Sequence, residues 1–518
     1  MTRRGLAGLT GLVGWARHDR WAQRAHERRA KRAAGTGYLV LCAALALCCA
    51  WAGAMLAVGT VLAAETAFGA ETAFGEETGI DEGSGFGISE IVASGDVEHA
   101  LAISLRGEGV TAAVASYSLS LSGEFGETGD DALGSFYVSV EGEYDLRSEE
   151  GKLMELDEAY VDVYLSGADL RLGQQVVSWG TAYALNPTSY VNPLPSAASS
   201  SSGSGIPVVG GSGGLDLGGL PVPAVTATVY PSWGDLGLVA VVNPRLQGVP
   251  LPVDAQTSLL QGVAHQIGEP LAPFGGRAEL SSDHFTVEPP ESLRDRLEYA
   301  ARVGTRVGGW DLYLSAFRGW DDHPVLWVSA TPMSPLEVRV DPHAAYRKVT
   351  EAGAAVSCTW GPYTFWGEGS YAWPDQVPEL DDPNNIAFSS NEPHWQAVVG
   401  GDRTFGDSSE VYLMMEYIYN SSGSIMMPYE LGPGGEVEAG NYAVGVVRWQ
   451  PEADHRFEVS GIYCVNDRSY VAVPRYTYQA DEHTSLWLGL ALSGGGRDTE
   501  FGALSDAPSA LIGMKLAF

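Results

Sequence analysis

Residues 509–518 read Ser-Ala-Leu-Ile-Gly-Met-Lys-Leu-Ala-Phe, and their side chains alternate in character. One face of an extended strand would carry Ala510, Ile512, Met514, Leu516 and Phe518. The other face would carry Ser509, Gly513 and Lys515. This period of two is typical of a strand that meets lipid on one side and a polar interior on the other. An edge strand of a water-soluble β-protein shows the same pattern, so the rest of the chain has to decide.

The first 64 residues have the organisation of an export signal. Residues 1–37 contain nine Lys and Arg against Asp19 and Glu27, and an apolar run follows over 38–64. Small side chains at Ala63 and Ala64 predict signal-peptidase cleavage at one of these two residues. The apolar run is long enough to span a bilayer, so an uncleaved anchor stays an alternative.

The composition agrees with an exported β-protein. After residue 64 the chain has two cysteines, Cys358 and Cys464, which is too few for a disulfide framework. The 65 Gly, 23 Tyr and 14 Trp suit tight turns and aromatic girdles. Removing the nine basic and two acidic residues of the signal takes the formal net charge from −34 to −41, which disfavours a nucleic-acid partner.

The remaining sequence predicts an all-β protein, a transmembrane antiparallel up-and-down β-barrel over residues 98–518. A flexible, acidic, Gly-rich lead-in is predicted for 65–97, where AETAFG occurs at 64–69 and again at 70–75. The expected strands are 99–107, 111–122, 134–146, 154–165, 168–178, 222–231, 235–243, 296–308, 310–319, 346–359, 361–373, 394–404, 409–420, 439–449, 455–465, 468–478, 484–493 and 507–518. That is about 18 strands, and 16–20 are possible because 320–345 contains a further strand-like stretch, Val325–Thr331.

Connection lengths separate a barrel from a β-sandwich, which would also alternate. Starting from the N-terminus, every second connection is short, whereas 179–221, 244–295, 320–345, 374–393 and 421–438 are long. Short turns at one end and long loops at the other are the arrangement of bacterial outer-membrane barrels. The aromatic Phe518, together with Ile512, Met514 and Leu516, is similar to the C-terminal signal that the barrel-assembly machinery recognises.

One region of about forty residues carries a family resemblance. It contains Arg171-Leu172-Gly173-Gln174-Gln175, then Trp179-Gly180, then Asn186-Pro187 and Asn192-Pro193. This R-x-G-x-Q, Trp-Gly and Asn-Pro series resembles a family of porin-like bacterial outer-membrane barrels related to alginate-export porins. The resemblance implies a barrel channel and leaves its solute open.

The same motif has a physical interpretation. A two-residue turn at Ser166-Gly167 would set Asp162 opposite Arg171, a cross-strand ion pair worth roughly 0.2–1 kcal/mol. We expect Trp179 at the outer rim as an interfacial aromatic, and both Asn-Pro pairs as turn starts that stiffen the first long loop. A folding element without any ligand would explain these residues equally well.

The two longest loops are candidates for a gate. We expect 179–221, with its Ser/Gly-rich part at 196–219, to bend inward and narrow the pore, because Gly and Ser bend at little steric cost. A flexible linker outside the cell would have the same composition. We expect 244–295, which is richer in charge and apolar residues, to cap the mouth.

Residues expected on the inner face were chosen by strand parity. The pore-lining set is Glu141, Glu143, Asp145, Glu158, Asp162, Arg171, Gln175, Glu298, Arg302, Arg306, Glu368 and Glu416. Its acidic surplus predicts a preference for cations. The alternative is that Arg171, Arg302 and Arg306 gather at the narrowest point and bind an anionic sugar.

Motifs for catalysis are weak, so we expect no enzyme, cofactor or metal. Asp321-Asp322-His323 is a compact acid/His cluster, but Gly319, Trp320 and Pro324 around it favour a solvated turn. The predicted function is passive diffusion of small hydrophilic solutes, saccharides or ions, through the outer membrane of a diderm bacterium. The alternatives are a structural or adhesive barrel closed by its own loops and a secreted all-β carbohydrate-active protein. Expected partners are the lipid bilayer, the assembly machinery and the solutes, and a homo-oligomer stays open.

Overall fold

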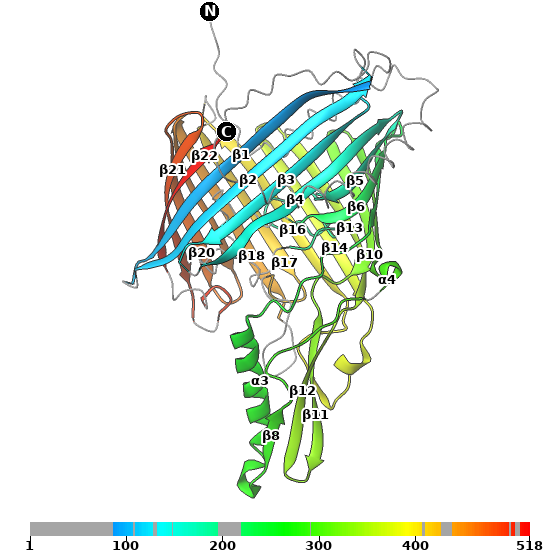
Figure 1. Ribbon diagram of the computed structural model, residues 1–518, viewed down its shortest axis with the longest axis vertical. Helices are drawn as coiled ribbons and strands as arrows, with labels where there is room; N and C mark the ends of the chain where they lie inside the picture. The colour runs from blue at the N-terminus through cyan, green and yellow to red at the C-terminus, as the bar shows by residue number, and fades with distance from the viewer. Residues whose placement is uncertain are drawn as a thin grey trace, which may run out of the picture.

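The chain forms a closed antiparallel barrel with a smaller domain at one end (Figure 1). The computed structural model describes residues 86–106, 109–127, 132–147, 149–194, 219–290, 292–406, 410–425, 438–496, 499–502 and 508–518. Eighteen strands make the barrel, and pairing of the first with the last closes it. In order around the wall they are β1 (Phe86–Ser104), β2 (Val110–Glu127), β3 (Gly134–Asp145), β4 (Glu150–Leu165), β5 (Ala168–Gln175), β6 (Val222–Val229), β7 (Asp235–Val241), β9 (Glu298–Val307), β10 (Trp310–Trp320), β13 (Lys348–Trp360), β14 (Tyr363–Pro374), β16 (His394–Phe405), β17 (Val411–Asn420), β18 (Gly440–Glu452), β19 (His455–Cys464), β20 (Tyr470–Gln479), β21 (Thr484–Gly494) and β22 (Ser509–Ala517). The predicted barrel of eighteen strands is confirmed.

The barrel begins earlier than residue 98. The predicted signal, 1–64, and residues 65–85 of the lead-in lie outside the described residues. Residues 86–97 belong to β1, where Phe86 pairs with Glu127 and Val97 with Tyr117 of β2. Residues 86–97 contain Phe86, Ile88, Ile91, Val92 and Val97, residue types that favour strands, so the lead-in was predicted to extend too far along the chain.

The register of β4 and β5 is the predicted one. Leu165 pairs with Ala168 across the Ser166-Gly167 turn, and Asp162 lies directly opposite Arg171. Gly167 has a φ of +88°, a value that glycine tolerates best in a tight turn. The short turn thus fixes which side chains of both strands face the interior.

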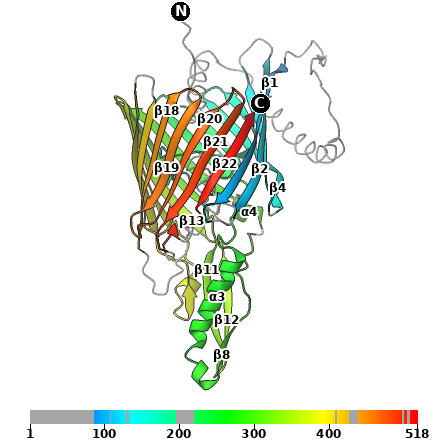
Figure 2. The ribbon, with the colours of Figure 1, turned by 90° about the vertical axis from the view of Figure 1, so that its left-hand side faces the viewer.

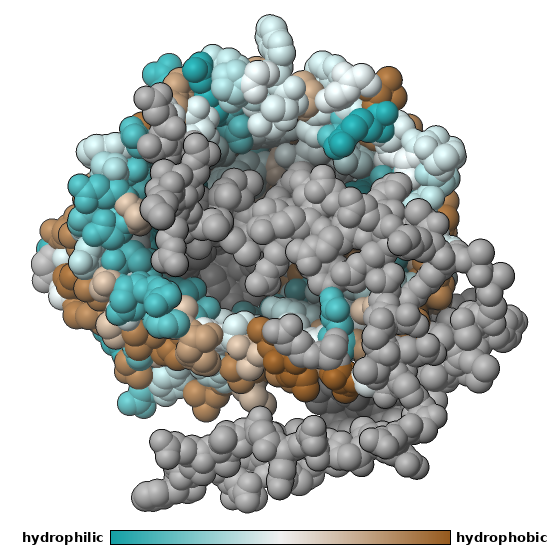
Figure 3. All heavy atoms as spheres, turned by 90° about the horizontal axis from the view of Figure 1, so that it is seen from above, coloured by the Kyte–Doolittle hydropathy of each residue, from teal (hydrophilic) through white to brown (hydrophobic). Residues whose placement is uncertain are grey.

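The outer surface of the wall is apolar, as a bilayer requires. On β10 the outward Leu312 and Leu314 are exposed, and on β22 so are Ile512, Met514, Leu516 and the adjoining Phe518. Exposed aromatic residues lie at strand ends, among them Trp310, Trp360, Trp373 and Trp395. Viewed along the barrel, apolar residues occupy several stretches of the outer margin (Figure 3). The wall therefore has the surface of a membrane-spanning barrel of the bacterial outer-membrane type.

The connections are sorted by length, as the sequence predicts. The tight turns 166–167, 308–309, 361–362 and 453–454 lie at the end that also holds Phe518 (Figure 1). The long connections 176–221, 242–297, 321–347, 375–393 and 421–439 lie at the opposite end. By the convention of outer-membrane barrels, the end with the long connections faces outward from the cell.

Three long connections build the smaller domain, which we call the outer domain. Its elements are α3 (Val253–Gly268), η2 (Ala272–Phe274), β8 (Arg277–Leu280), β11 (Val325–Ser334), β12 (Glu337–Ala345), η3 (Pro378–Leu380) and β15 (Asn385–Ala387). The strands form one sheet in the order β15-β11-β12-β8. Leu260 and Val263 of α3 pack against Leu326 and Val340 of this sheet in a single apolar cluster.

The outer domain corrects two expectations about loops. The strand-like stretch 325–331 is β11, which belongs to the small sheet and not to the barrel. Residues 244–295 contribute α3 and β8 to a domain that projects away from the barrel, instead of lying across the mouth as a cap (Figures 1 and 2). A short helix, α4 (Leu293–Arg296), leads back into β9. Among the described residues, no helix is both long and apolar enough to span a membrane.

Candidate functional site in the barrel lumen

The first part of the connection after β5, over the described residues 176–194, folds into the lumen and is held there by a buried carboxylate. We call its residues 179–193 the inner segment. Glu368 on β14, 5% exposed, accepts hydrogen bonds from the backbone amides of Thr181 and Ala182 and from the Thr188 hydroxyl, the last two at 2.6 and 3.0 Å. Hydrogen bonds from amides to a charged acceptor are among the stronger ones in proteins. Glu368 therefore anchors the inner segment to the wall.

A second carboxylate continues this anchor. Glu416 on β17, 3% exposed, accepts from the amides of Tyr183 and Ala184 at 2.8 and 3.1 Å, and from Trp366 Nε1 at 2.9 Å. Around the wall, β6, β7, β9, β10 and β13 separate β5 from β14. The inner segment therefore crosses the lumen from one part of the wall to another.

Asn192 fastens the end of the inner segment to the end of β5 and to the residues that lead into β6. Its Oδ1 accepts from Val177 N at 2.7 Å, and its Nδ2 donates to the carbonyls of Gln175 and Leu220 at 3.1 and 2.7 Å. Glu158 on β4 accepts from Val176 N at 2.8 Å. Because these bonds hold the chain on both sides of the inner segment, ordering the segment in a single conformation costs little additional conformational entropy.

One motif residue lies differently from what we expected, and another lies as expected. Trp179 is 6% exposed and packs inside the barrel with Tyr190 and Phe317, so its placement at the outer rim was wrong. The reason is that the chain turns inward directly after β5, which carries the ring to the lumen side. Asn186 does begin a turn, because Ser189 N donates to its carbonyl at 3.0 Å.

The hydrogen bonds between Glu368 and the inner segment require a glycine at position 180. Its φ is +103°, and a Cβ added there would lie 2.7 Å from Asn186 Oδ1 and 2.8 Å from Glu368 Oε1. Any side chain at this position would push the carboxylate away from the amides that it accepts from. The Trp-Gly pair of the motif therefore serves the inward path of the chain.

The predicted pore-lining charges fall into two groups. Asp162 and Arg171 form a bidentate pair at 2.7 and 2.9 Å, Arg302 pairs with Asp235 at 3.4 Å, and Arg306 pairs with Asp311 at 2.6 Å. These arginines are each matched by a carboxylate and do not gather into one basic strip. Their role in conduction stays a prediction.

The remaining predicted residues include several with structural partners. Asp145 is buried and accepts from the amides of Ala113 and Arg147, and Gln175 bonds to Ala224 O and Thr226 Oγ1. Glu298 accepts from Trp320 N at 2.8 Å. Glu141 and Glu143 share one face of β3, and Glu141 is exposed. Within this set, Glu141 on β3 is therefore the carboxylate most open to a solute, because Glu155 on the neighbouring β4 pairs with Lys152 and Arg245.

Sequence reasoning missed a charged row on β18 to β21. Arg448 pairs with Glu458 at 2.5 Å, and Arg475 lies 4.0 Å from the centre of the Trp487 ring. Trp487 Nε1 also donates to Glu98 Oε1 on β1 at 2.9 Å. Strand parity places Arg448 and Glu458 inward, so the alternation that located the other charges could have found them.

The strand alternation predicts polar side chains over the whole inner surface of the barrel, and this prediction is wrong for one part of the wall. Inward side chains of β17 to β20 near the outer end are apolar and buried, among them Met414, Ile418, Val444, Ile462 and Val471. Ala184 and Leu185 of the inner segment pack against this cluster. An apolar wall sector is stable here because the chain itself covers it.

The Asp321-Asp322-His323 cluster lies at the base of the outer domain and is not a solvated turn. The three residues are half-buried, and Asp321 pairs with Arg347 at 3.3 Å. Within the described ranges, ligand atoms of three metal-binding side chains come together at Glu452, Asp454 and His455, on a tight turn at the opposite end. Glu452 is exposed there, and such groups are common without an ion.

No protein-family model matches the chain, and no curated protein matches it. Among solved structures it is similar to OmpF of Salmonella typhi in complex with daunomycin, at 9% identity and a TM-score of 0.40, over 83% of this chain and 97% of that one. It is similar to OccK5 (OpdH) of Pseudomonas aeruginosa, at 7% identity and a TM-score of 0.41, over the same shares. A mutant Rh. blastica porin matches at 12% identity and a TM-score of 0.35, over 83% and 100%. At these values the likeness carries nothing about solute or selectivity.

Proposed function

We propose that the protein is an outer-membrane channel, not an enzyme, through which small hydrophilic solutes diffuse. The observation that carries the proposal is the inner segment, held across the lumen of a membrane-spanning barrel by Glu368 and Glu416. Two buried carboxylates committed to loop amides are costly unless the loop's position matters, because their charges must leave water. Narrowing an otherwise wide barrel is the function that this position supports.

The charges inside favour cations as the preferred ions. Arg171, Arg302, Arg306 and Arg448 are each paired with a carboxylate, while Arg456 and Arg475 add positive charge to the inner face of β19 and β20 near Glu458. Glu141, by contrast, has no hydrogen bond or ion pair with a described residue, and Glu143 and Asp157 lie near it. An acidic surplus on the water-filled side selects by its field. The anionic-sugar channel suggested by the alginate-export resemblance has less support, because its arginines are neutralised.

The test is the single-channel conductance of a variant that lacks both anchors. In Glu368→Ala with Glu416→Ala, the amides of residues 181–184 lose their acceptors, and we expect the conductance to rise at least about twofold as the inner segment detaches. Glu141→Ala removes a lumenal carboxylate that does not touch the inner segment, and is the matched control. Heat-modifiable migration on gels verifies that each barrel is folded. Unchanged conductance in a folded double variant would refute the narrowing role.

A structural or adhesive barrel is the second candidate. Two features favour this candidate: the apolar inner surface on β17 to β20 and the projecting outer domain. A pore for simple diffusion needs neither of them. A purified, folded wild type that never conducts would select this candidate, and a double variant that then conducts would show that the inner segment closes its pore. The secreted β-sandwich loses its basis, since the sheet is closed and apolar outside.

A further inference from the structure

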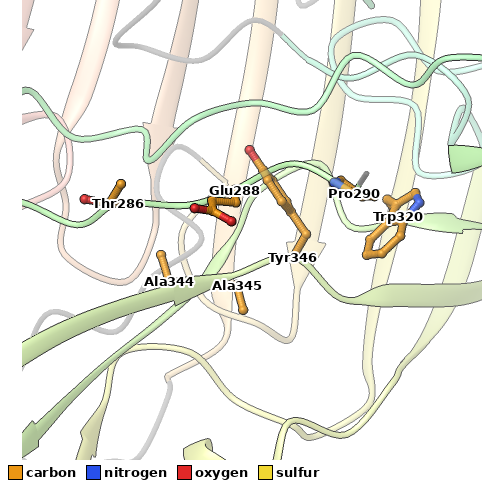
Figure 4. A pocket seen from close by; sticks show the side chains of 7 residues that line it. All are labelled: Thr286, Glu288, Pro290, Trp320, Ala344, Ala345 and Tyr346. Atoms are coloured by element: carbon orange, nitrogen blue, oxygen red, sulfur yellow. The ribbon is translucent and has the colours of Figure 1, made fainter. Parts of the chain in front are cut away.

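A cavity of about 460 Å³ lies where the outer domain meets the rim of the barrel (Figure 4). It is lined by Thr286, Glu288, Pro290, Trp320, Ala344, Ala345 and Tyr346. These residues come from the segment between β8 and α4, from the end of β10 and from the end of β12. In Figure 4 the Tyr346 ring stands between Glu288 on one side and Pro290 and Trp320 on the other. A solute approaching the outer mouth would meet this cavity before the lumen.

Both aromatic rings are fixed by contacts outside the cavity. Trp320 Nε1 donates to the carbonyl of Asp295 at 2.8 Å, and Tyr346 Oη donates to the carbonyl of Gln247 at 2.7 Å. The ring edges are therefore satisfied, and the rings offer π-faces rather than hydrogen-bonding groups. Rings held in place before a ligand arrives reduce the entropy cost of binding.

Groups of both signs border the cavity, and the negative one is exposed to a ligand. The Lys348 ammonium lies 5.2 Å from the centre of the Trp320 ring and already occupies its cation–π face, so the Tyr346 ring is the face that remains for a ligand. Glu288 is exposed and forms no hydrogen bond or ion pair with any described residue. The buried carboxylate of Glu298 accepts a hydrogen bond from the backbone amide of Trp320 and is not open to a ligand. A free carboxylate beside fixed aromatic rings is the arrangement that binds alkylammonium groups.

We propose that this cavity binds a small organic cation with an alkylammonium group, with Glu288 as its counter-charge and Tyr346 as its cation–π face. The proposal deepens the proposed function, on which it rests, by naming a class of solute that is collected at the outer mouth. A neutral saccharide could also stack on these rings, but it would gain little from the negative charge of Glu288. The two ligand classes are therefore separable by charge alone.

The experiment is a ligand-observed NMR titration of the folded, full-length protein in detergent. Choline is the probe, and its uncharged isostere 3,3-dimethylbutan-1-ol is the matched ligand. We expect choline to bind saturably and the isostere to bind at least about tenfold more weakly. Equal binding of the two ligands, or saturable binding of a neutral hexose without binding of choline, would overturn the proposal.

Three variants and one control locate the site. Glu288→Gln should weaken choline binding about five- to tenfold, and Tyr346→Leu should do so as well. Tyr346→Phe keeps the ring but loses the hydrogen bond to the Gln247 carbonyl, so it should lose much less affinity than Tyr346→Leu. Glu269→Gln removes an exposed carboxylate at the end of α3, outside the cavity, and should change nothing. Heat-modifiable migration shows that each variant is folded. Unchanged choline binding in folded Glu288→Gln would overturn the assignment.

The outcome is separable from that of the proposed function. Binding in detergent needs no conduction, so a wild type that conducts but does not bind choline overturns the cavity and leaves the channel intact. A wild type that binds choline but never conducts overturns the channel and leaves the binding site.

Discussion

Single carboxylates have sharply different roles in this barrel, although parity alone makes them look alike. Glu368 and Glu416 are buried acceptors for loop amides, whereas Glu141 is exposed on the same inner face. Asp322 has a third environment, at the base of the outer domain. Burial raises the pKa of Asp322 well above its ordinary value, and the negative charges of Glu298, Asp321 and Glu351 raise it further.

The raised pKa of Asp322 predicts that the base of the outer domain is more stable in mild acid than at higher pH. The unfolded group releases its proton near pH 3.9 and the folded group only at higher pH. Between these two values the folded state binds more protons, so stability falls as the pH rises. The backbone amide of Gln247 donates to the backbone carbonyl of Asp322 at 2.8 Å, so it exchanges with solvent only when the base of the outer domain opens locally. Its rate of hydrogen exchange therefore measures the local stability.

We expect Gln247 protection, corrected for intrinsic exchange, to be lower at pH 8 than at pH 5. Asp322→Asn should remove the difference, and Glu269→Gln should keep it. A pH difference that persists in Asp322→Asn would show that another group is responsible.

At the scale of elements, β22 closes the barrel by pairing with β1, and Phe518, the residue after β22, extends this pairing. Gly95 and Phe518 exchange both backbone hydrogen bonds at 2.9 Å, and Lys515 points inward to Asp96 at 3.2 Å. Phe518 itself is 65% exposed on the outer surface. Its ring is thus available both to lipid and to a protein that recognises the strand during assembly.

Deleting Phe518 should lower the amount of assembled barrel in the membrane several-fold while synthesis continues, because the closing pair with Gly95 and the exposed ring are both lost. Heat-modifiable protein in the membrane fraction, compared with total protein, measures the effect. Phe518→Tyr keeps an aromatic ring and is the control. Equal membrane levels of the truncated chain and the wild type would contradict this role of the C-terminal strand.

Elements whose partners are adjacent in sequence were predictable, and elements with distant partners were not. Period-two alternation located the eighteen barrel strands, and the Ser166-Gly167 turn gave the Asp162–Arg171 register. The outer domain was missed because α3 packs on β11 and β12, which come from a separate connection. Parity placed Glu368 inward, but it contains no information that its partners are the amides of Thr181 and Ala182.

At the scale of the whole molecule, the inner wall is divided into unlike sectors. Carboxylates line β3 and β4, an apolar cluster covers part of β17 to β20, and the inner segment packs against this cluster through Ala184 and Leu185. Water and ions will follow the acidic sector, because the apolar one is packed against the chain. The ion selectivity of the channel should therefore depend on the charge of the side chains on β3 and β4, and not on the net charge of the whole protein.

The reversal potential of wild-type channels in a planar bilayer, under a salt gradient, tests this account most directly. We predict stepwise conductance with a reversal potential of the sign that indicates cation preference, and a weaker preference in Glu141→Gln. Anion selectivity that disappears in Arg302→Ala with Arg306→Ala would contradict the account and establish the anionic-substrate alternative.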